Sequence, residues 1–570
     1  MKPAFLKSVI LLIIGVCFIG PFSWGQTVSV GISRYWIQFK DKNNSPYSVT
    51  TPSAFLSARS IQRRLNQSIP ITFTDLPVNQ SYVDSVAATG AHIHLRSKWF
   101  NGVVVKVTGQ AQLTAITNLS FVAGSLPVGG IKQAPGAGSY DKFRSVPIAD
   151  SHKLISSDPT PASLNYGPSL NQISMLNGVC MHDKGYQGQG MVIAILDAGF
   201  QHVDTLKAFD SLRVNNQILG THDFVDENDS VYGADRHFHG TCVLSCMGGN
   251  MPGSIIGTAP KAKYWLFITE DINSEYVVEE YNWAAGAERA DSVGADVINT
   301  SLGYTTFDDT ILNHNYASMN GHTTPCARAA NFASNKGIAV VCAAGNMGGT
   351  AWHYIGTPAD ADSVLAVGSV NSSGVYSSFS SEGPGSGGDI KPAVASEGEG
   401  SIVADWASNG ILAQNGTSFA SPIMCGMVAC LWQAHPTLSN TQILQAIEKS
   451  ATQFAHPDSM LGYGIPDFCL ANSSLGIHEV SVTDGDYLSN IFPNPFTGSL
   501  RVIFWSSQSQ DVGVTLSDLC GRVIYTETHR AAVQSYNNWV LSGLSPIPAG
   551  LYLLTVKTGN EVFVKKLVKE

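Results

Sequence analysis

Four side chains of this sequence have the types that an acyl-transfer reaction needs: Asp197, His239, Asn346 and Ser418. A serine hydroxyl becomes a nucleophile when a base removes its proton, and an imidazole works best as that base when a carboxylate fixes its tautomer. We therefore interpret Ser418 as the nucleophile, His239 as the general base and Asp197 as the orienting carboxylate. Asn346 and the backbone amide of Ser418 would donate to the developing oxyanion.

Each of these residues also has an ordinary structural interpretation. An aspartate at a strand end commonly makes a turn, as does an asparagine after a glycine. A histidine before Gly-Thr commonly lies at a helix end, and a serine at a helix start is commonly an N-cap. The catalytic hypothesis therefore depends on a fold that brings all four together.

Buried strands alternating with helices would bring them together. Three apolar runs contain no polar residue: 191–196, 338–344 and 364–367. Such runs are typical of strands covered on both faces. Helical patterns occur at 277–290 and 325–335, and a capping box at Ser439 begins a helix that runs to about residue 451. We expect an α/β fold, with a mostly parallel sheet, helices on both faces and a site at the strands' carboxyl ends.

Ser418 stands close to the start of a long apolar helix. We expect Gly416 to allow a tight turn before it, and the helix dipole to favour negative charge at Ser418. We expect Pro422 to fall in the first helical turn, where a missing N–H is tolerated.

Six stretches within residues 165–475 resemble the subtilisin-like serine peptidases, the subtilase family. They are ILDAG at 195–199, HGT at 239–241, VINTSLG at 297–303, AAGN at 343–346, FSSEGP at 379–384 and NGTSFASP at 415–422. The order Asp, His, Ser along the chain is also that of subtilisin. The resemblance implies a serine endopeptidase that works through a Ser-His-Asp triad and an acyl-enzyme intermediate.

The resemblance also implies a substrate cleft. Its residues would be Ser301, Leu302, Gly303, Ala343, Ala344, Gly345 and Gly356. The segment at 301–303 would pair with an extended substrate by β-addition. Gly356 corresponds to the floor of the pocket, and small residues there predict a large apolar or aromatic side chain before the cut bond.

Two features bear on the chemistry of the site. Ala198 replaces the hydroxyl-bearing residue that relatives carry after the aspartate, which removes a donor to the carboxylate. We expect no cofactor and no metal. An acidic cluster is interpreted as a solvated loop, with calcium as the alternative; its members are Asp223, Asp226, Glu227 and Asp229.

The chain before the peptidase region divides into three parts. Residues 1–25 have two early lysines, an apolar run too short to cross a bilayer and small residues at the end, which predicts a secretory signal. Acylation of Cys17 is the weaker alternative. Residues 26–128 form an α+β unit in the position of a pro-segment, which implies a ferredoxin-like folding assistant and inhibitor; a permanent accessory domain is the alternative. Residues 129–164 are a linker with a maturation site.

After a linker at 476–486, residues 487–570 alternate short strands with turns, which predicts a small β-sandwich. Its FPNPF, LCGR and AGLYLL stretches and basic end resemble the C-terminal sorting domain of the type IX secretion route in Bacteroidetes. This implies export through the outer membrane, then attachment to the cell surface or release. A carbohydrate-binding sandwich is the alternative.

Composition limits the partners. The net charge of -10 and the lack of a basic run argue against nucleic acid. Ten cysteines form no ligand-spaced pairs, and export permits disulfides whose partners the sequence does not assign. We expect protein or peptide substrates, the pro-segment and the sorting machinery as partners. The alternatives are a hydrolase that acts on esters and an inactive peptide-binding surface protein.

Overall fold

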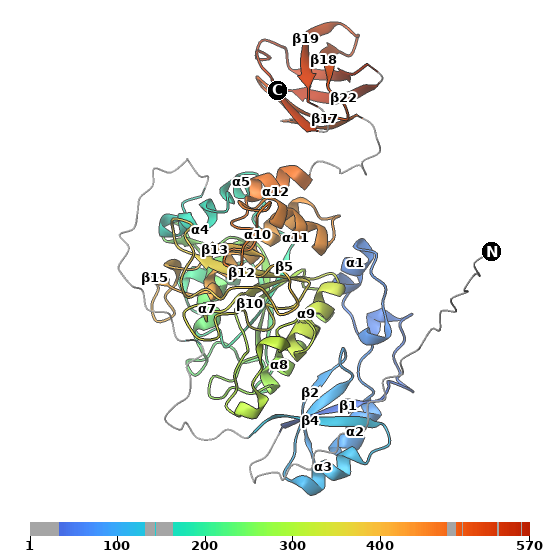
Figure 1. Cartoon of the computed structure of the whole chain (residues 1–570), viewed down its shortest axis with the longest axis vertical. Helices are drawn as coiled ribbons and strands as arrows, with labels where there is room; N and C mark the ends of the chain where they lie inside the picture. Colours follow the sequence, from blue (N-terminus) through green and yellow to red (C-terminus); the bar gives the residue numbers. More distant parts are fainter. Residues whose placement is uncertain are drawn as a thin grey trace, which may run out of the picture.

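The computed structural model describes residues 34–130, 143, 164–475, 486–492, 494–532, 535–559 and 561–570. They form an N-terminal unit, a central unit and a C-terminal unit (Figure 1). The predicted signal peptide at 1–25 lies outside the described residues, as do most of the linkers at 129–164 and 476–486.

The N-terminal unit is a four-stranded antiparallel sheet with the order β2-β3-β1-β4. Its elements are β1 (Arg34–Phe39), α1 (Ala58–Asn66), α2 (Gln80–Ala87), β2 (His92–Ser97), β3 (Gly102–Lys106), α3 (Gln110–Thr117) and β4 (Val122–Gly129). This order and topology are ferredoxin-like. In β1, Tyr35, Ile37 and Phe39 enter the unit's own core, whereas Trp36 points to the opposite face of the sheet.

The central sheet has seven strands in the order β13-β12-β11-β10-β5-β9-β6, and every pairing is parallel. The strands are β5 (Val192–Asp197), β6 (Ile218–Asp223), β9 (Lys263–Ile268), β10 (Val297–Thr300), β11 (Ala339–Ala343), β12 (Val364–Val370) and β13 (Val394–Glu397). Two short antiparallel pairs accompany them: β7 (Asn250–Met251) with β8 (Ile255–Ile256), and β14 (Ser401–Ala404) with β15 (Ile411–Gln414).

Helices cover both faces of this sheet, which confirms the predicted fold class. The helices are α4 (Leu170–Ser174), α5 (Val179–Asp183), α6 (Asp210–Val214), α7 (His239–Gly248), α8 (Val278–Val293), α9 (Pro325–Asn335), α10 (Thr417–Ala434), α11 (Asn440–Lys449) and α12 (Phe468–Leu475). In β5, Ile193 and Ile195 pack into the core that contains α7 and α10, while Ala194 and Leu196 face α8 and α9. This two-sided burial explains the unbroken apolar run. The predicted capping box at Ser439 is present at the start of α11.

The N-terminal unit packs on α8 and α9 (Figure 1). Trp36 stacks on Tyr281 of α8 with ring centroids 4.8 Å apart, and Trp99 stacks on Phe332 of α9 at 5.7 Å. Both tryptophans are buried in a core that the two units share.

A buried ion network lies beside this aromatic contact. Asp291 of α8 pairs with Arg63 at 2.6 Å, Arg64 at 2.8 Å and Lys98 at 3.0 Å, all from the N-terminal unit. Burial alone would raise the pKa of Asp291, but the three cations hold it well below its usual range. The carboxylate therefore stays ionised and fixes the three basic side chains.

The C-terminal unit is the predicted β-sandwich. One sheet has the order β16-β17-β20 and the other β19-β18-β21-β22. The strands are β16 (Tyr487–Phe492), β17 (Leu500–Ser506), β18 (Gln510–Asp518), β19 (Val523–Ala531), β20 (Ser535–Leu541), β21 (Gly550–Lys557) and β22 (Val562–Lys569). The inner faces meet in a core that includes Phe496, Phe504 and Leu554.

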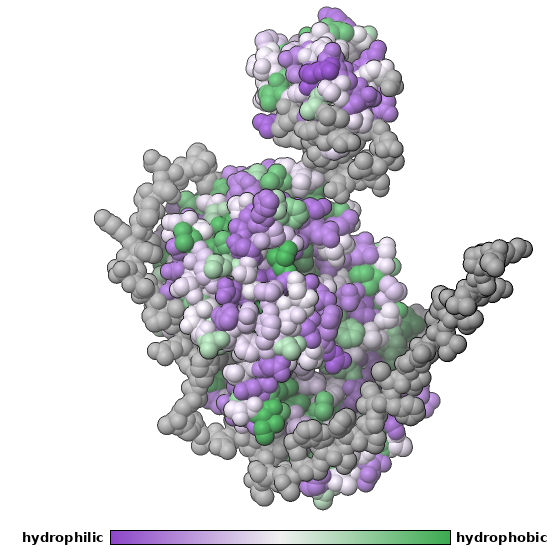
Figure 2. Space-filling model, viewed as in Figure 1, coloured by the Kyte–Doolittle hydropathy of each residue, from purple (hydrophilic) through white to green (hydrophobic). Residues whose placement is uncertain are grey.

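A disulfide between Cys180 and Cys469 joins α5 to α12 across 289 residues of sequence. Of the other described cysteines, six are buried and Cys520 is exposed. On the face seen in Figure 2, apolar residues of the central unit are scattered among polar and weakly polar ones. None of the helices that the structure describes has both the length and the apolar character that a membrane crossing requires.

Candidate active site

The predicted site residues follow the carboxyl ends of adjacent strands. Asp197 is the last residue of β5, Ser301 follows β10, and Asn346 comes shortly after β11. Because β10 lies between β5 and β11 and all three are parallel, these ends share one edge of the sheet. Two helices begin at the same edge: His239 is the first residue of α7, and Ser418 is the second residue of α10.

Asp197 and His239 are in direct contact. The Nδ1 atom of His239 lies 2.8 Å from Oδ1 of Asp197, which also accepts the amide of Ala198 at 2.8 Å. A neutral imidazole held this way carries its proton on Nδ1 and leaves Nε2 as a base. Oδ2 of Asp197 is buried and has no hydrogen-bond donor among the described residues. Ala198 supplies no hydroxyl to it, as its side chain led us to expect.

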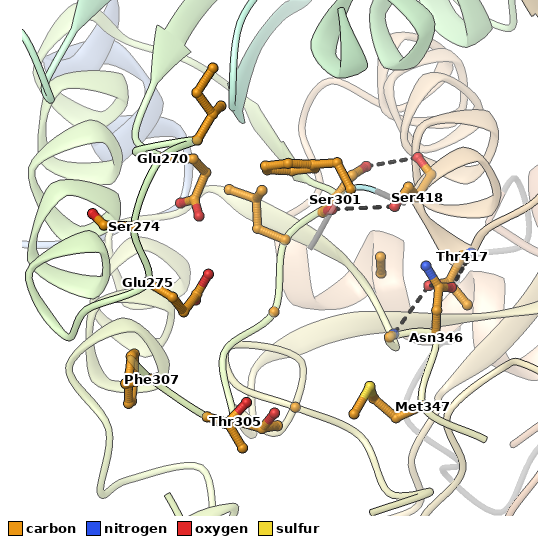
Figure 3. Close-up of a pocket in the computed structure, with 18 of the residues that line it drawn as sticks. Glu270, Ser274, Glu275, Ser301, Thr305, Phe307, Asn346, Met347, Thr417 and Ser418 are labelled. Atoms are coloured by element: carbon orange, nitrogen blue, oxygen red, sulfur yellow. Dashed lines mark hydrogen bonds between the residues drawn. The ribbon is translucent and has the colours of Figure 1, made fainter. Parts of the chain in front are cut away.

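The hydroxyl of Ser418 donates to the carbonyl of Ser301 at 3.4 Å (Figure 3). Among the described residues, no hydrogen bond joins Ser418 to His239. Catalytic hydrogen bonds are often absent or long before substrate binds. A rotation about the Cα–Cβ bond of Ser418 changes the partner of this hydroxyl without moving the backbone.

Asn346 is held in one orientation. Its Oδ1 accepts two bonds from Thr417, from the backbone amide and from the hydroxyl, each at 2.9 Å. Because both partners are donors, the remaining Nδ2 group of Asn346 is the donor side of the amide. Thr417 precedes Ser418, so this contact brings the donor next to the start of α10.

Pro422 corrects one expectation from the sequence. Helix α10 begins at Thr417, so Pro422 is its sixth residue and lies in the second turn, not the first. The proline has no N–H to give to the carbonyl of Ser418, four residues earlier. The hydroxyl of Ser301 donates to that carbonyl instead, at 2.8 Å. A side chain of the neighbouring strand end therefore replaces the missing helical bond.

This hydrogen bond belongs to a buried network of polar side chains that the sequence did not reveal. The hydroxyl of Ser421 donates to Oδ1 of Asn299 at 3.0 Å, and Nδ2 of Asn299 donates to Ser301 at 3.3 Å. This network of hydrogen bonds connects α10 to β10 and to Ser301 next to Ser418. The available signal was a polar residue, Asn299, inside a fully buried strand.

Ser418 and Asn346 open onto a cavity of about 210 Å³. Six of the seven predicted cleft residues line it: Ser301, Leu302, Gly303, Ala343, Gly345 and Gly356. Ala344 is not in the lining; it is fully buried, and its amide bonds to Val367. Residues that we did not anticipate also line the cavity, among them Phe143, Glu270, Glu275, Phe307, Asp308 and Met347.

Each carboxylate of the predicted acidic cluster contacts basic side chains. Arg236 pairs with both Asp223 and Asp226, His222 pairs with Asp229, and His92 and His94 of the N-terminal unit pair with Glu227. Burial opposes ionisation of Glu227, but the bonds from the two histidines outweigh it and lower its pKa to about 2. In the described part of the chain, no three His, Cys, Asp or Glu side chains gather as metal ligands would.

The fold and the site define a class. A parallel α/β sheet that presents an Asp-His pair, a helix-start serine and an oriented asparagine at one edge is typical of hydrolases with a serine nucleophile. Residues 188–464 match the Subtilase family, Peptidase S8, and the chain belongs to that family.

Similar proteins cover the central unit. Subtilisin of Bacillus pumilus is 31% identical over 285 residues, which are 49% of this chain and 90% of that protein. Subtilisin DY of Bacillus licheniformis is 32% identical over 274 residues, 47% of this chain and 86% of that protein. Subtilisin E of Bacillus subtilis (strain 168) is 31% identical over 284 residues, 49% of this chain, and the chain spans 65% of its length. The crystal structure of MycP1 from Mycobacterium smegmatis aligns with a TM-score of 0.42 at 23% identity, over 53% of this chain and 84% of that one.

The flanking units match as well. Residues 34–135 match the Peptidase S8 propeptide domain of Bacteroidota, and residues 490–570 match the secretion system C-terminal sorting domain. These matches confirm the resemblances that the sequence indicated for both ends of the chain. The C-terminal unit implies export from the cell or to its surface.

Proposed function

We propose that this protein is a serine endopeptidase, made as a zymogen and exported by the type IX route. The observation that carries the proposal is the bond between His239 and Asp197 at the strand edge that also presents Ser418. Asn346, beside the start of α10, supplies the oriented amide. Two observations support export. The C-terminal unit matches a sorting domain, and residues 1–25 have the composition of a secretory signal.

The proposed reaction follows from these groups. The Oγ of Ser418 attacks the substrate carbonyl while Nε2 of His239 takes its proton, and Asp197 stabilises the imidazolium that forms. Nδ2 of Asn346 and the amide of Ser418 donate to the oxyanion. His239 then gives the proton to the leaving amine, and the acyl-enzyme forms. Water, deprotonated by the same imidazole, releases the acyl group and restores Ser418.

The zymogen proposal rests on how the N-terminal unit and the linker approach the cleft. The N-terminal unit shares a buried core with α8 and α9, next to the cleft wall. Phe143, from the predicted linker, lines the cavity, with its ring centroid 4.9 Å from His239 and 4.7 Å from His237. We propose that the N-terminal unit inhibits the enzyme and that the chain is cut within 129–164.

The pocket beyond Gly356 is proposed to take a large apolar or aromatic side chain before the cut bond. A Cβ added to Gly356 would approach Thr305 to 3.3 Å, so a larger residue here would narrow the pocket. We retain the proposal that catalysis needs no metal or cofactor, since every step above uses side chains and amides of this chain.

A fluorophosphonate probe tests the nucleophile directly. We expect the mature protein to be labelled at Ser418 and to cut casein, and Ser418→Ala to lose both properties. Asn346→Ala should keep labelling at a reduced rate and lose about 100 to 1,000-fold in kcat, the magnitude measured for subtilisin. A protein that hydrolyses short-chain esters but never casein would favour the esterase alternative. Absence of labelling would favour an inactive peptide-binding protein.

A further inference from the structure

One wall of the cavity is acidic. The segment at 270–280, which leads from β9 into the first turn of α8, contains five carboxylates and no lysine or arginine. Glu270 and Glu275 of this segment line the cavity together with Asp308, and none of the described lining residues is basic. Figure 3 shows Glu270, Ser274 and Glu275 on one side of the cavity, with Asn346, Thr417 and Ser418 on the other.

Hydrogen bonds hold this wall in place. The hydroxyl of Thr269 donates to Oε1 of Glu270 at 3.2 Å, and Tyr304 donates to the same oxygen. Burial, and then the charge of Glu270, raise the pKa of Tyr304 well above its usual value, so Tyr304 keeps the proton that it donates. Glu279 accepts the amides of Asp271 and Tyr276 at 2.8 and 3.0 Å, which fixes the turn that carries Glu275.

The acidic wall serves a different substrate side chain from the one that enters the Gly356 pocket. Successive side chains of an extended peptide point in opposite directions. Residues 301–303 run between Glu270 and the nucleophile (Figure 3). A peptide paired with this segment can therefore send one side chain to the Gly356 pocket and another toward Glu270 and Glu275.

We propose that this wall selects peptides with a lysine or arginine at one position before the cut bond, held by Glu270 and Glu275. The inference rests on the proposed endopeptidase function and names part of its substrate class. Glu270 is almost fully buried and Glu275 half-buried, so a cation between them is partly shielded from water and forms charge-assisted hydrogen bonds. Among the described linker residues, Phe143 lines the cavity, and it lies between Lys142 and Arg144 in the sequence.

The test uses the mature protein and internally quenched peptides that differ by Lys, Gln or Glu at one of four positions before the cut bond. At one position we expect kcat/KM for the Lys peptide to exceed that for the Gln peptide about tenfold or more, with the Glu peptide the slowest. The preference should shrink as salt is raised from low ionic strength to 1 M.

Variants then locate the preference. The double variant Glu270→Gln, Glu275→Gln keeps the hydrogen-bond acceptors and should bring the Lys-to-Gln ratio close to one. Glu275→Gln alone changes only a half-buried side chain and should give a partial loss. Asp210→Asn, which removes an exposed charge on α6 outside the cavity, is the matched control and should leave the ratio as it is.

A ratio near one at all four positions in the unmodified protein would overturn the inference, as would an unchanged ratio in the double variant. Cleavage of every peptide at similar rates would leave the endopeptidase proposal standing. A protein that cuts none of the peptides and is not labelled at Ser418 would overturn both.

Discussion

The N-terminal α+β unit and the C-terminal β-sandwich are both small and have cores of their own, but they relate differently to the central unit. The N-terminal unit shares a second buried core with α8 and α9, and its basic residues surround Asp291. Among the residues that the structure describes, no side-chain hydrogen bond joins the sandwich to either of the other two units, and Figure 1 draws it apart from them. The N-terminal unit therefore makes an extensive contact with the central unit, whereas the C-terminal unit is a separate module. This difference agrees with the proposed inhibitor at the N-terminal end and with a sorting domain at the C-terminal end.

The largest expected effect comes from the ion network. Asp291→Ala removes the buried anion that Arg63, Arg64 and Lys98 share, although Arg64 keeps a second partner in Asp75, at 2.8 Å. The free energy of unfolding should therefore fall by about 3–5 kcal/mol. Chemical denaturation of the full chain measures this, in a Ser418→Ala background that prevents self-cutting. Asp511→Ala, which removes an exposed pair with Arg530 in the sandwich, should change the value by less than about 1 kcal/mol. If Asp291→Ala and Asp511→Ala lowered the free energy of unfolding equally, the contrast between the N-terminal and C-terminal units would be wrong.

The disulfide gives the next largest effect. Replacing both Cys180 and Cys469 by serine should lower the stability of the central unit by about 2–4 kcal/mol, because the bridge restricts the unfolded chain over a long loop. Thermal unfolding of oxidised and reduced protein measures it. The exposed Cys520 of the sandwich is the control, since Cys520→Ser removes no bridge. An unchanged midpoint on reduction would contradict this.

Acid should loosen the N-terminal unit. In the docked protein, burial lowers the pKa of His94, with help from Arg34 and Lys106 and against the pull of Glu227. A solvent-exposed histidine in the released unit has a pKa of about 6.5. Below that pH the released unit binds a proton that the docked unit resists, so docking is strongest above the ordinary value and weakens as pH falls through it.

Gel filtration of the complex after the linker is cut measures the bound fraction between pH 7.5 and 5.5. We expect a decrease of up to about tenfold in affinity per pH unit, and His94→Gln should flatten the profile. The Nε2 atom of His94 lies 3.2 Å from Oδ1 of Asn282, which glutamine can approach as a neutral donor. If the N-terminal unit bound more tightly at pH 5.5 than at pH 7.5, the predicted direction of this pH dependence would be wrong.

The smallest expected effect is that of removing the C-terminal sandwich. A chain that ends at residue 475 lacks the sandwich, and its thermal midpoint should match that of the full chain for the remaining two units. Differential scanning calorimetry of the Ser418→Ala forms measures both. A drop of several degrees on truncation would show that the sandwich stabilises its neighbours.

The strand edge could be predicted from sequence because its causes are local. Runs such as 191–196 must be buried on both faces, and parallel strands place their carboxyl ends together whatever lies between them. Asp197 and Asn346 follow such runs, and His239 and Ser418 stand at helix starts, so their neighbourhood was predictable even though the side-chain orientation of Ser418 was not.

The remaining features depend on distant residues. Arg63 and Asp291 are 228 positions apart, and neither carries a local pattern that names the other. The position of Pro422 in α10 required the exact start of the helix, and its compensation by Ser301 comes from another strand. No local pattern in the sequence singles out Glu270 and Glu275, which line the cleft because the fold brings their segment to the same cavity as Ser418.

Self-processing tests the central claim most directly. The full chain and its Ser418→Ala variant are purified free of other peptidases, and the N-terminal sequence and intact mass of each are followed over time. The account predicts a new N-terminus within 129–164 for the unmodified chain and none for the variant. If the purified variant acquires the same N-terminus at the same rate, Ser418 is not the nucleophile that matures this protein.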